Sequence, residues 1–259
     1  MTRAEKLTTV AENQQKVYDA GYGTGYETGH AAGYELGEVN GWMDGKDEGY
    51  AEGKQVEYNS FWDAYQTNGN RTDYSSGFFG AGWTDETFKP KYDLQPKKAG
   101  EMFSYSRITN LVSLLEELGV TLDFSQSTDM GYVFSNAYSL KRVGVMDCSS
   151  APNINSLFMN CSVETVGKLI LPPNAEMLYA FEGSSALKDI IIEGEISYNG
   201  VNFVVSTKLT HDSLMSIINA LADNSGSGTT KTCNLGTTNL AKLTDAEKAI
   251  ATQKGWTLA

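Results

Sequence analysis

Glycine recurs at every fourth position in the first part of the chain, and the residue after it is usually aromatic. A helix turns about 100° per residue, so this row stays on one face only if helices wrap around each other with a right-handed twist. Nine glycines would cost an isolated helix roughly 7 to 9 kcal/mol, and the pattern therefore predicts close packing of two or more chains. The row consists of Gly21, Gly25, Gly29, Gly33, Gly37, Gly41, Gly45, Gly49 and Gly53.

Other interpretations of this segment stay open. A glycine-rich stretch can be a flexible spacer, and a four-residue period also fits a strand with glycine on one face. The residues between the glycines favour a helix. Upstream, an alternating spacing of three and four is typical of a short coiled coil, although a single amphipathic helix on its own domain fits it too; it is formed by Leu7, Val10, Gln14 and Val17. We predict that residues 1–57 form an oligomerisation stalk, with a trimer favoured over a dimer.

Aromatic residues crowd the next stretch, among glycines, asparagines and serines. So many rings can pack on one another and form a compact collar, which is the favoured interpretation. Alternatively, exposed rings stack on sugars, and the candidates for such a glycan contact are Trp62, Tyr65 and Trp83. Prolines and lysines between residues 90 and 98 indicate a boundary. Residues 58–99 are therefore predicted to form an aromatic collar and a linker.

A second repeat emerges after residue 107. Phe134, Phe158 and Phe181 lie 24 and 23 residues apart, and each opens a short polar turn: FSNAYSL, FMNCSVE and FEGSSAL. Apolar runs in phase with these turns are centred near Leu122, Val145, Leu169 and Ile191. A period of this length is typical of a solenoid in which each turn supplies one short strand. The three phenylalanines are predicted to be equivalent core positions.

Helices and a strand are expected at the two ends of this solenoid, because terminal turns need caps. Residues 108–118 have helical periodicity and are the predicted leading cap. An amphipathic helix is expected from Thr210, a strand in KTCNLG, and a last helix whose capping box is Thr244 and Glu247 and whose C-terminal stop is Gly255. The predicted fold class is α+β: a helical stalk, a collar, and a leucine-rich-repeat domain over residues 100–259.

Composition narrows the function. The formal net charge of −12 argues against nucleic acid or an anionic membrane as a partner. No apolar stretch reaches the roughly 20 residues of a membrane span, and the beginning lacks the apolar core of a secretory signal. Three cysteines without a C-x-x-C pair and two histidines make a metal site or a cofactor unexpected, and the cysteines are predicted to be core residues. No catalytic motif is present, so we expect no enzyme activity.

The phased F-x-N/G turns with their following strands, over residues 121–205, resemble the BspA-type leucine-rich repeats of bacterial surface proteins. The ending LTHDSLMSIINALAD and CNLGTTNLAKLTDAEKAIATQKGWTL resembles the closing segment of such proteins in prophages of Gram-positive gut bacteria. The G-Y-x-x-G-Y array and the aromatic stretch resemble the same prophage group, whose members are taken to be virion or tail components. With only about three recognisable turns, the chain departs from a regular array, and a long concave binding face is not expected.

This resemblance implies a non-enzymatic virion protein, a tail fibre or receptor-binding protein for host attachment. Its N-terminus would bind other virion proteins, and its repeat domain would contact a host surface glycan or protein. One alternative is a BspA-like adhesin located on the bacterial cell surface rather than in a phage tail. A second alternative is an enzyme acting on cell-wall glycans, whose two carboxylates would be far apart in the sequence.

Overall fold

In the computed structural model the chain divides into two units, residues 1–69 and 70–259. The structure describes residues 74–75, 77–78, 80, 83–90 and 93–259, all of which belong to the second unit. The predicted stalk over residues 1–57 lies outside the described residues. The described part is an α/β unit with two small parallel sheets and a large buried aromatic cluster.

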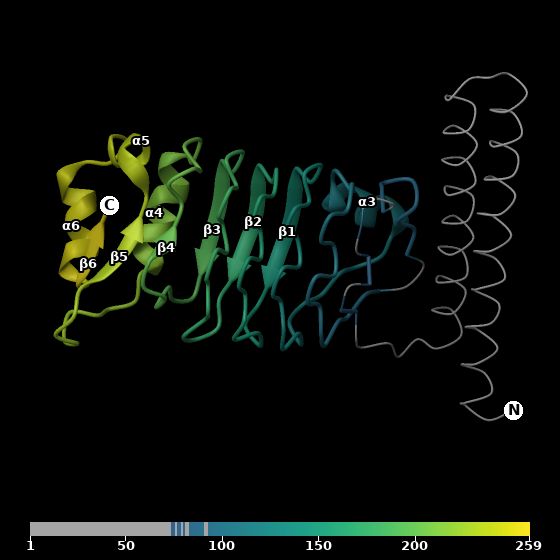
Figure 1. Ribbon diagram of the computed structural model, residues 1–259, viewed down its shortest axis with the longest axis horizontal. Helices are drawn as coiled ribbons and strands as arrows, with labels where there is room; N and C mark the ends of the chain where they lie inside the picture. The colour runs from purple at the N-terminus through teal and green to yellow at the C-terminus, as the bar shows by residue number, and fades with distance from the viewer. Residues whose placement is uncertain (1–73, 76, 79, 81–82, 91–92) are drawn as a thin grey trace, which may run out of the picture. The chain divides into compact units, whose positions relative to one another are not determined.

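The first sheet has the order β1-β2-β3 and is parallel throughout. Its strands are β1 (Arg142–Asp147), β2 (Thr165–Ile170) and β3 (Asp189–Glu193), which lie side by side in Figure 1. Each strand buries two apolar side chains on one face, and these are Val143, Met146, Val166, Leu169, Ile190 and Ile192. One face of the sheet therefore forms part of the core.

Helices cover both edges of this sheet. At the β1 edge lies α3 (Leu111–Leu118), whose N-cap Asn110 forms a parallel bridge with Arg142. At the β3 edge lies α4 (His211–Ala220), where Ser213 Oγ accepts from Ile190 N at 2.9 Å and Ser216 Oγ from Ile192 N at 2.8 Å. The two serines thus satisfy backbone donors that an open edge strand would leave unpaired.

The second sheet has the order β4-β5-β6, and α4 lies between β4 and β5 in the sequence. It consists of β4 (Val201–Asn202), β5 (Lys231–Asn234) and β6 (Trp256–Leu258), with α5 (Gly236–Leu240) and α6 (Asp245–Gln253) between β5 and β6. The predicted helix from Thr210, the strand in KTCNLG and the Thr244–Glu247 capping box are confirmed. Gly255 has a left-handed φ of 77°. The strand at Trp256 was not predicted.

The aromatic cluster runs through the unit as a stack of phenylalanine rings. Phe134 lies 5.5 Å from Phe158, and Phe158 lies 5.8 Å from Phe181, between ring centroids. All three are buried, as the repeat predicts. The stack extends further in both directions than the sequence indicated, to Phe78 and Phe103 on one side and to Phe203 on the other.

We call the segment of chain from one stacked phenylalanine to the next a coil. Backbone hydrogen bonds join each coil to the next around this stack. Phe134 N donates to Leu157 O at 2.9 Å, and Phe158 N donates to Ala180 O at 2.8 Å. The backbone N–H groups two residues before and two residues after Phe134 and Phe158 donate to carbonyl oxygens of the next coil in the same way. Successive phenylalanines are therefore held in register by the main chain as well as by ring packing.

Two expectations about the beginning of the repeat need correction. The helix over 111–118 is not a leading cap, because coils containing Phe78 and Phe103 precede it. The boundary expected at residue 99 also differs from the structure: Pro96 is buried, and Lys98 O accepts a hydrogen bond from Tyr74 N. Prolines mark a linker only when they are solvated, whereas Pro90 and Pro96 are buried here; Lys97 and Lys98 are exposed.

Candidate functional site

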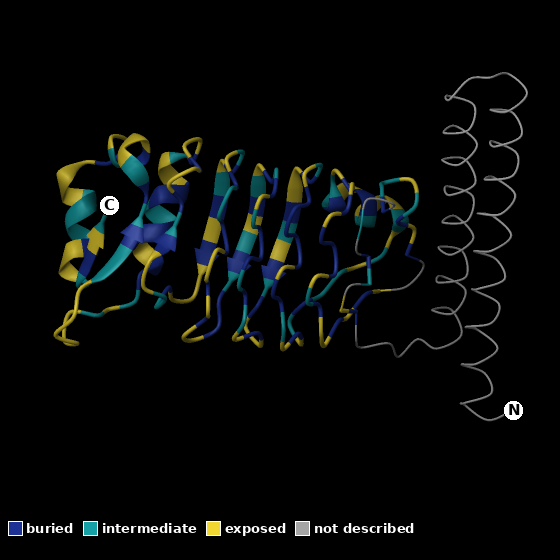
Figure 2. Cartoon of the chain, in the orientation of Figure 1, coloured by how far each residue is buried: buried dark blue, intermediate teal, exposed yellow. Residues whose placement is uncertain are grey.

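The outer face of the first sheet exposes apolar side chains on rigid strands. Val145 on β1 is 59% exposed and Ile191 on β3 is 56% exposed. Between them lies Lys168 on β2, the Cα partner of Val145, whose Nζ donates to Glu193 Oε2 at 2.8 Å. The exposed bands on the three strands are visible in Figure 2. This face combines apolar and charged groups and is open to a partner.

Glycine creates the local shape of this face. In β1 and β2 two residues separate the buried positions, and the first of the two is Gly144 or Gly167. A Cβ at Gly167 would lie 3.1 Å from Gly144 O, closer than ordinary contact. The close approach of β1 and β2 at this position therefore favours glycine at Gly167.

Exposed tyrosines gather on the phenylalanine-containing turns. Tyr132 is 44%, Tyr138 is 60% and Tyr179 is 56% exposed. Tyr132 and Tyr179 each stand two residues before a phenylalanine of the stack, in the sequences Y-V-F and Y-A-F. Sequence reasoning missed them, although this recurrent spacing could have identified them.

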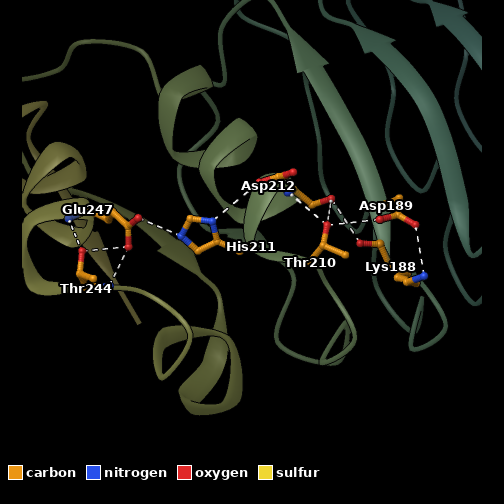
Figure 3. A network of polar contacts seen from close by, with 8 residues as sticks. Lys188, Asp189, Thr210, His211, Asp212, Thr244 and Glu247 are labelled. Carbon is orange, nitrogen blue, oxygen red and sulfur yellow. Dashed lines mark hydrogen bonds and ion pairs between the residues drawn. The ribbon is translucent and has the colours of Figure 1, made fainter.

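Polar contacts tie α4, α6 and β3 together at one end of the unit (Figure 3). His211 Nε2 lies 2.8 Å from Glu247 Oε1, while Glu247 Oε2 accepts from Thr244 N at 2.7 Å and from its hydroxyl at 2.9 Å. These hydrogen bonds lower the pKa of Glu247, and the bond from the backbone N–H of Thr244 has the largest effect. Thr210 Oγ1 donates to Asp189 Oδ1 at 3.3 Å. Both Glu247 oxygens are occupied, which fits a structural link.

Metal binding and thiol chemistry find no support in the described ranges. No group of three His, Cys, Asp or Glu residues there is placed to hold a metal ion. The three cysteines are free and buried, as predicted, and burial raises the pKa of each thiol to about 12. Thiolates, the reactive form, are therefore scarce. The helices described here include none with the length and apolar character that a bilayer crossing requires.

The predicted contact residues have different outcomes. Trp83 is buried, 5% exposed, and packs edge-on against Phe78 with ring centroids 5.0 Å apart. The prediction that Trp83 contacts a glycan is wrong, because this packing leaves neither face of the ring free for a sugar. The favoured collar interpretation applies to this ring instead. Trp62, Tyr65 and the stalk residues from Leu7 to Gly53 lie outside the described residues.

Comparison of the chain with protein-family models, with curated proteins and with solved structures finds no match.

Proposed function

We propose that residues 70–259 form a short leucine-rich-repeat solenoid of the BspA type that contacts the surface of a host bacterium. On this proposal the protein is a non-enzymatic virion component, a tail fibre or receptor-binding protein. Residues 1–57 associate as a trimer and attach to other virion proteins. The target on the host is a surface glycan or a protein.

The observation that carries this proposal is the exposure of large apolar side chains on coils that are locked in register. Val145 and Ile191 lie on strands of one sheet, and Tyr132 and Tyr179 lie on turns held by main-chain hydrogen bonds. Exposed apolar groups on a rigid frame lose little conformational entropy when they bind a partner. The turns FSNAYSL, FMNCSVE and FEGSSAL support the assignment to BspA-type repeats.

Retention on intact Gram-positive cells tests which part of the chain makes the contact. We would compare residues 70–259 with residues 1–69, because a fragment that starts at residue 100 loses Phe78 and Phe88 from the aromatic cluster. We expect residues 70–259 to be retained at physiological salt. Retention of residues 1–69 alone would reverse the assignment of roles along the chain.

The virion assignment has its own test. Antibodies against the full-length protein, used in immunogold electron microscopy of an induced culture, should label particles at the tail. Label confined to the cell wall would favour the adhesin, and release of soluble sugar from purified wall material would favour an enzyme.

A further inference from the structure

Three residues at the same place in successive coils form a row on the surface of the turns. Tyr132, Ser156 and Tyr179 each stand two residues before a stacked phenylalanine. Tyr132 N donates to Asn155 O at 2.9 Å, and Ser156 N donates to Leu178 O at 2.8 Å. These bonds make the three residues neighbours along the stack, with the serine between the two tyrosines.

The backbone of this row is left-handed, which is unfavourable for a tyrosine. The φ angles are 60° at Tyr132 and 57° at Tyr179. Bulky side chains rarely adopt this conformation, whereas glycine and asparagine adopt it readily. The second left-handed position in the same coils follows that preference, being Asn136, Asn160 and Gly183. The two tyrosines are thus poorly suited to their backbone.

Packing does not account for the two tyrosines either, since about half of each side chain is in solvent. Residues in strained backbone conformations cluster at functional sites. Ser156, in contrast, is buried, and its hydroxyl has no hydrogen-bond partner among the residues the structure describes. Other buried serines in these turns have one: Ser184 Oγ donates to Phe158 O, and Ser206 Oγ donates to Ser184 O.

From this geometry we infer that the row of Tyr132, Ser156 and Tyr179 binds an uncharged glycan that lies along the stack of coils. The inference rests on the proposed host contact and names its site and ligand class. Two coil steps separate the tyrosines by about 10 Å, which leaves room for each ring to pack against a different sugar of one chain. The serine between them is small, so no side chain obstructs the path.

Local charge selects against anionic polymers. Residues 129–138, 153–160 and 176–185, which form the three turns, contain no lysine or arginine but include Asp129, Glu176 and Glu182. Glu176 Oε2 accepts from Asn155 Nδ2 at 3.4 Å, and Asn155 also accepts from the backbone of Leu178. Carboxylates and amides form hydrogen bonds with sugar hydroxyls, and the carboxylates repel phosphate groups. A neutral polysaccharide therefore fits the row better than a phosphate-containing wall polymer.

The test measures binding of the labelled full-length protein to an array of neutral and phosphate-substituted bacterial polysaccharides. Tyr132→Asn and Tyr179→Asn remove one ring each and supply a residue that tolerates the left-handed backbone. We expect each to weaken binding to a neutral polysaccharide by at least about tenfold while the melting temperature stays within about 2 °C. Tyr138→Ala is the matched control, because it removes a tyrosine ring of similar exposure outside the row, and it should bind within about threefold of wild type.

The outcomes separate this inference from the proposed function. If the wild-type protein is retained by cells and both asparagine variants bind as it does, the row is not the site although host contact stands. If the protein is retained by cells but binds only phosphate-substituted polymers or no glycan, the ligand class is wrong. A large fall in melting temperature in both variants would assign the tyrosines to stability and overturn the inference. Failure of the wild-type protein to bind cells at all would contradict the proposed function itself.

Discussion

Removing one ring from the middle of the phenylalanine stack tests the physical basis of the whole unit. Phe158 has no solvent exposure and lies between Phe134 and Phe181, with ring centroids 5.5 and 5.8 Å away. Its ring is nearly parallel to that of Phe134, at an interplanar angle of 4°. The substitution Phe158→Ala would remove the ring and leave both neighbours without a contact on one side.

The expected loss in the free energy of unfolding is about 3 to 5 kcal/mol, the range for a buried phenylalanine truncated to alanine. Two features favour the upper part of that range. Each aromatic contact contributes about 0.5 to 1.5 kcal/mol beyond the area that it buries, and Phe158 has one on either side. In addition, main-chain hydrogen bonds such as Phe158 N to Ala180 O fix the spacing of the coils, so the cavity cannot close by collapse.

Urea unfolding of the full-length chain provides the measurement. Trp256 is buried at 1% exposure and reports on the unit by fluorescence; the midpoint and the slope together give the free energy. Ile191→Ala is the matched control, because its side chain is 56% exposed and a surface change is usually worth less than about 0.5 kcal/mol. Losses below about 1 kcal/mol on substituting each of Phe134, Phe158 and Phe181 would refute the reasoning.

Two further predictions concern a glycine and a carboxylate. Gly183→Ala should cost about 1 to 3 kcal/mol in urea unfolding, because φ is 73° and the new Cβ would lie 2.1 Å from Asn160 Oδ1; Gly226→Ala, with open space around it, should cost little. Because the pKa of Glu247 is lowered in the folded state, its carboxylate stabilises the fold above its ordinary pKa, and this stability is lost as pH falls through the lowered value. Glu247→Gln, which keeps the capping box, should therefore lose less stability in acid than wild type; equal losses would contradict the assignment.

Local signals in the sequence identified α4, β5 and α6 correctly. Thr244 and Glu247 are three residues apart at the beginning of α6, and the structure has both reciprocal hydrogen bonds. Thr210 caps α4 in the same local way. Such caps depend on neighbours in the sequence, and for that reason they could be predicted without knowledge of the fold. β6 could not, because a three-residue strand is defined by its partner β5.

The extent of the phenylalanine stack was underestimated for a different reason. Phe103 and Phe134 are adjacent in the stack but 31 residues apart in the sequence, because their coil contains α3. A search for a fixed period cannot link them. The burial of Trp83 against Phe78 and Phe88 agrees with the favoured collar interpretation, because these three rings are close in the sequence as well as in the cluster. The exposed tyrosines of the candidate site follow a local spacing, Y-x-F, and their left-handed backbone could not be inferred from it.

The shrinking spacing of the phenylalanines follows from where each coil shortens. Leu140 and Leu187 lie six residues after their phenylalanine, whereas Val163 lies only five after Phe158, and all three are buried. The next buried position follows three residues later in each coil, as Val143, Val166 and Ile190. Compared with the other two coils, the coil that begins at Phe158 therefore has one residue fewer in its turn, whereas the distance from the turn to the strand is unchanged.

The third coil, from Phe181 to Phe203, is two residues shorter than the first, and one of these two residues is missing from its strand. Buried positions are three residues apart in β1 and in β2 but only two apart in β3, where Ile190 and Ile192 enclose Ile191. The register between β2 and β3 shifts at that point, between Val166 and Leu169. Both kinds of shortening fall between positions that must stack, in a turn or at a bulge, so the buried side chains keep their alignment. An irregular period in the sequence is therefore compatible with regular stacking of the rings, because only the buried positions are constrained by their neighbours in the adjacent coils.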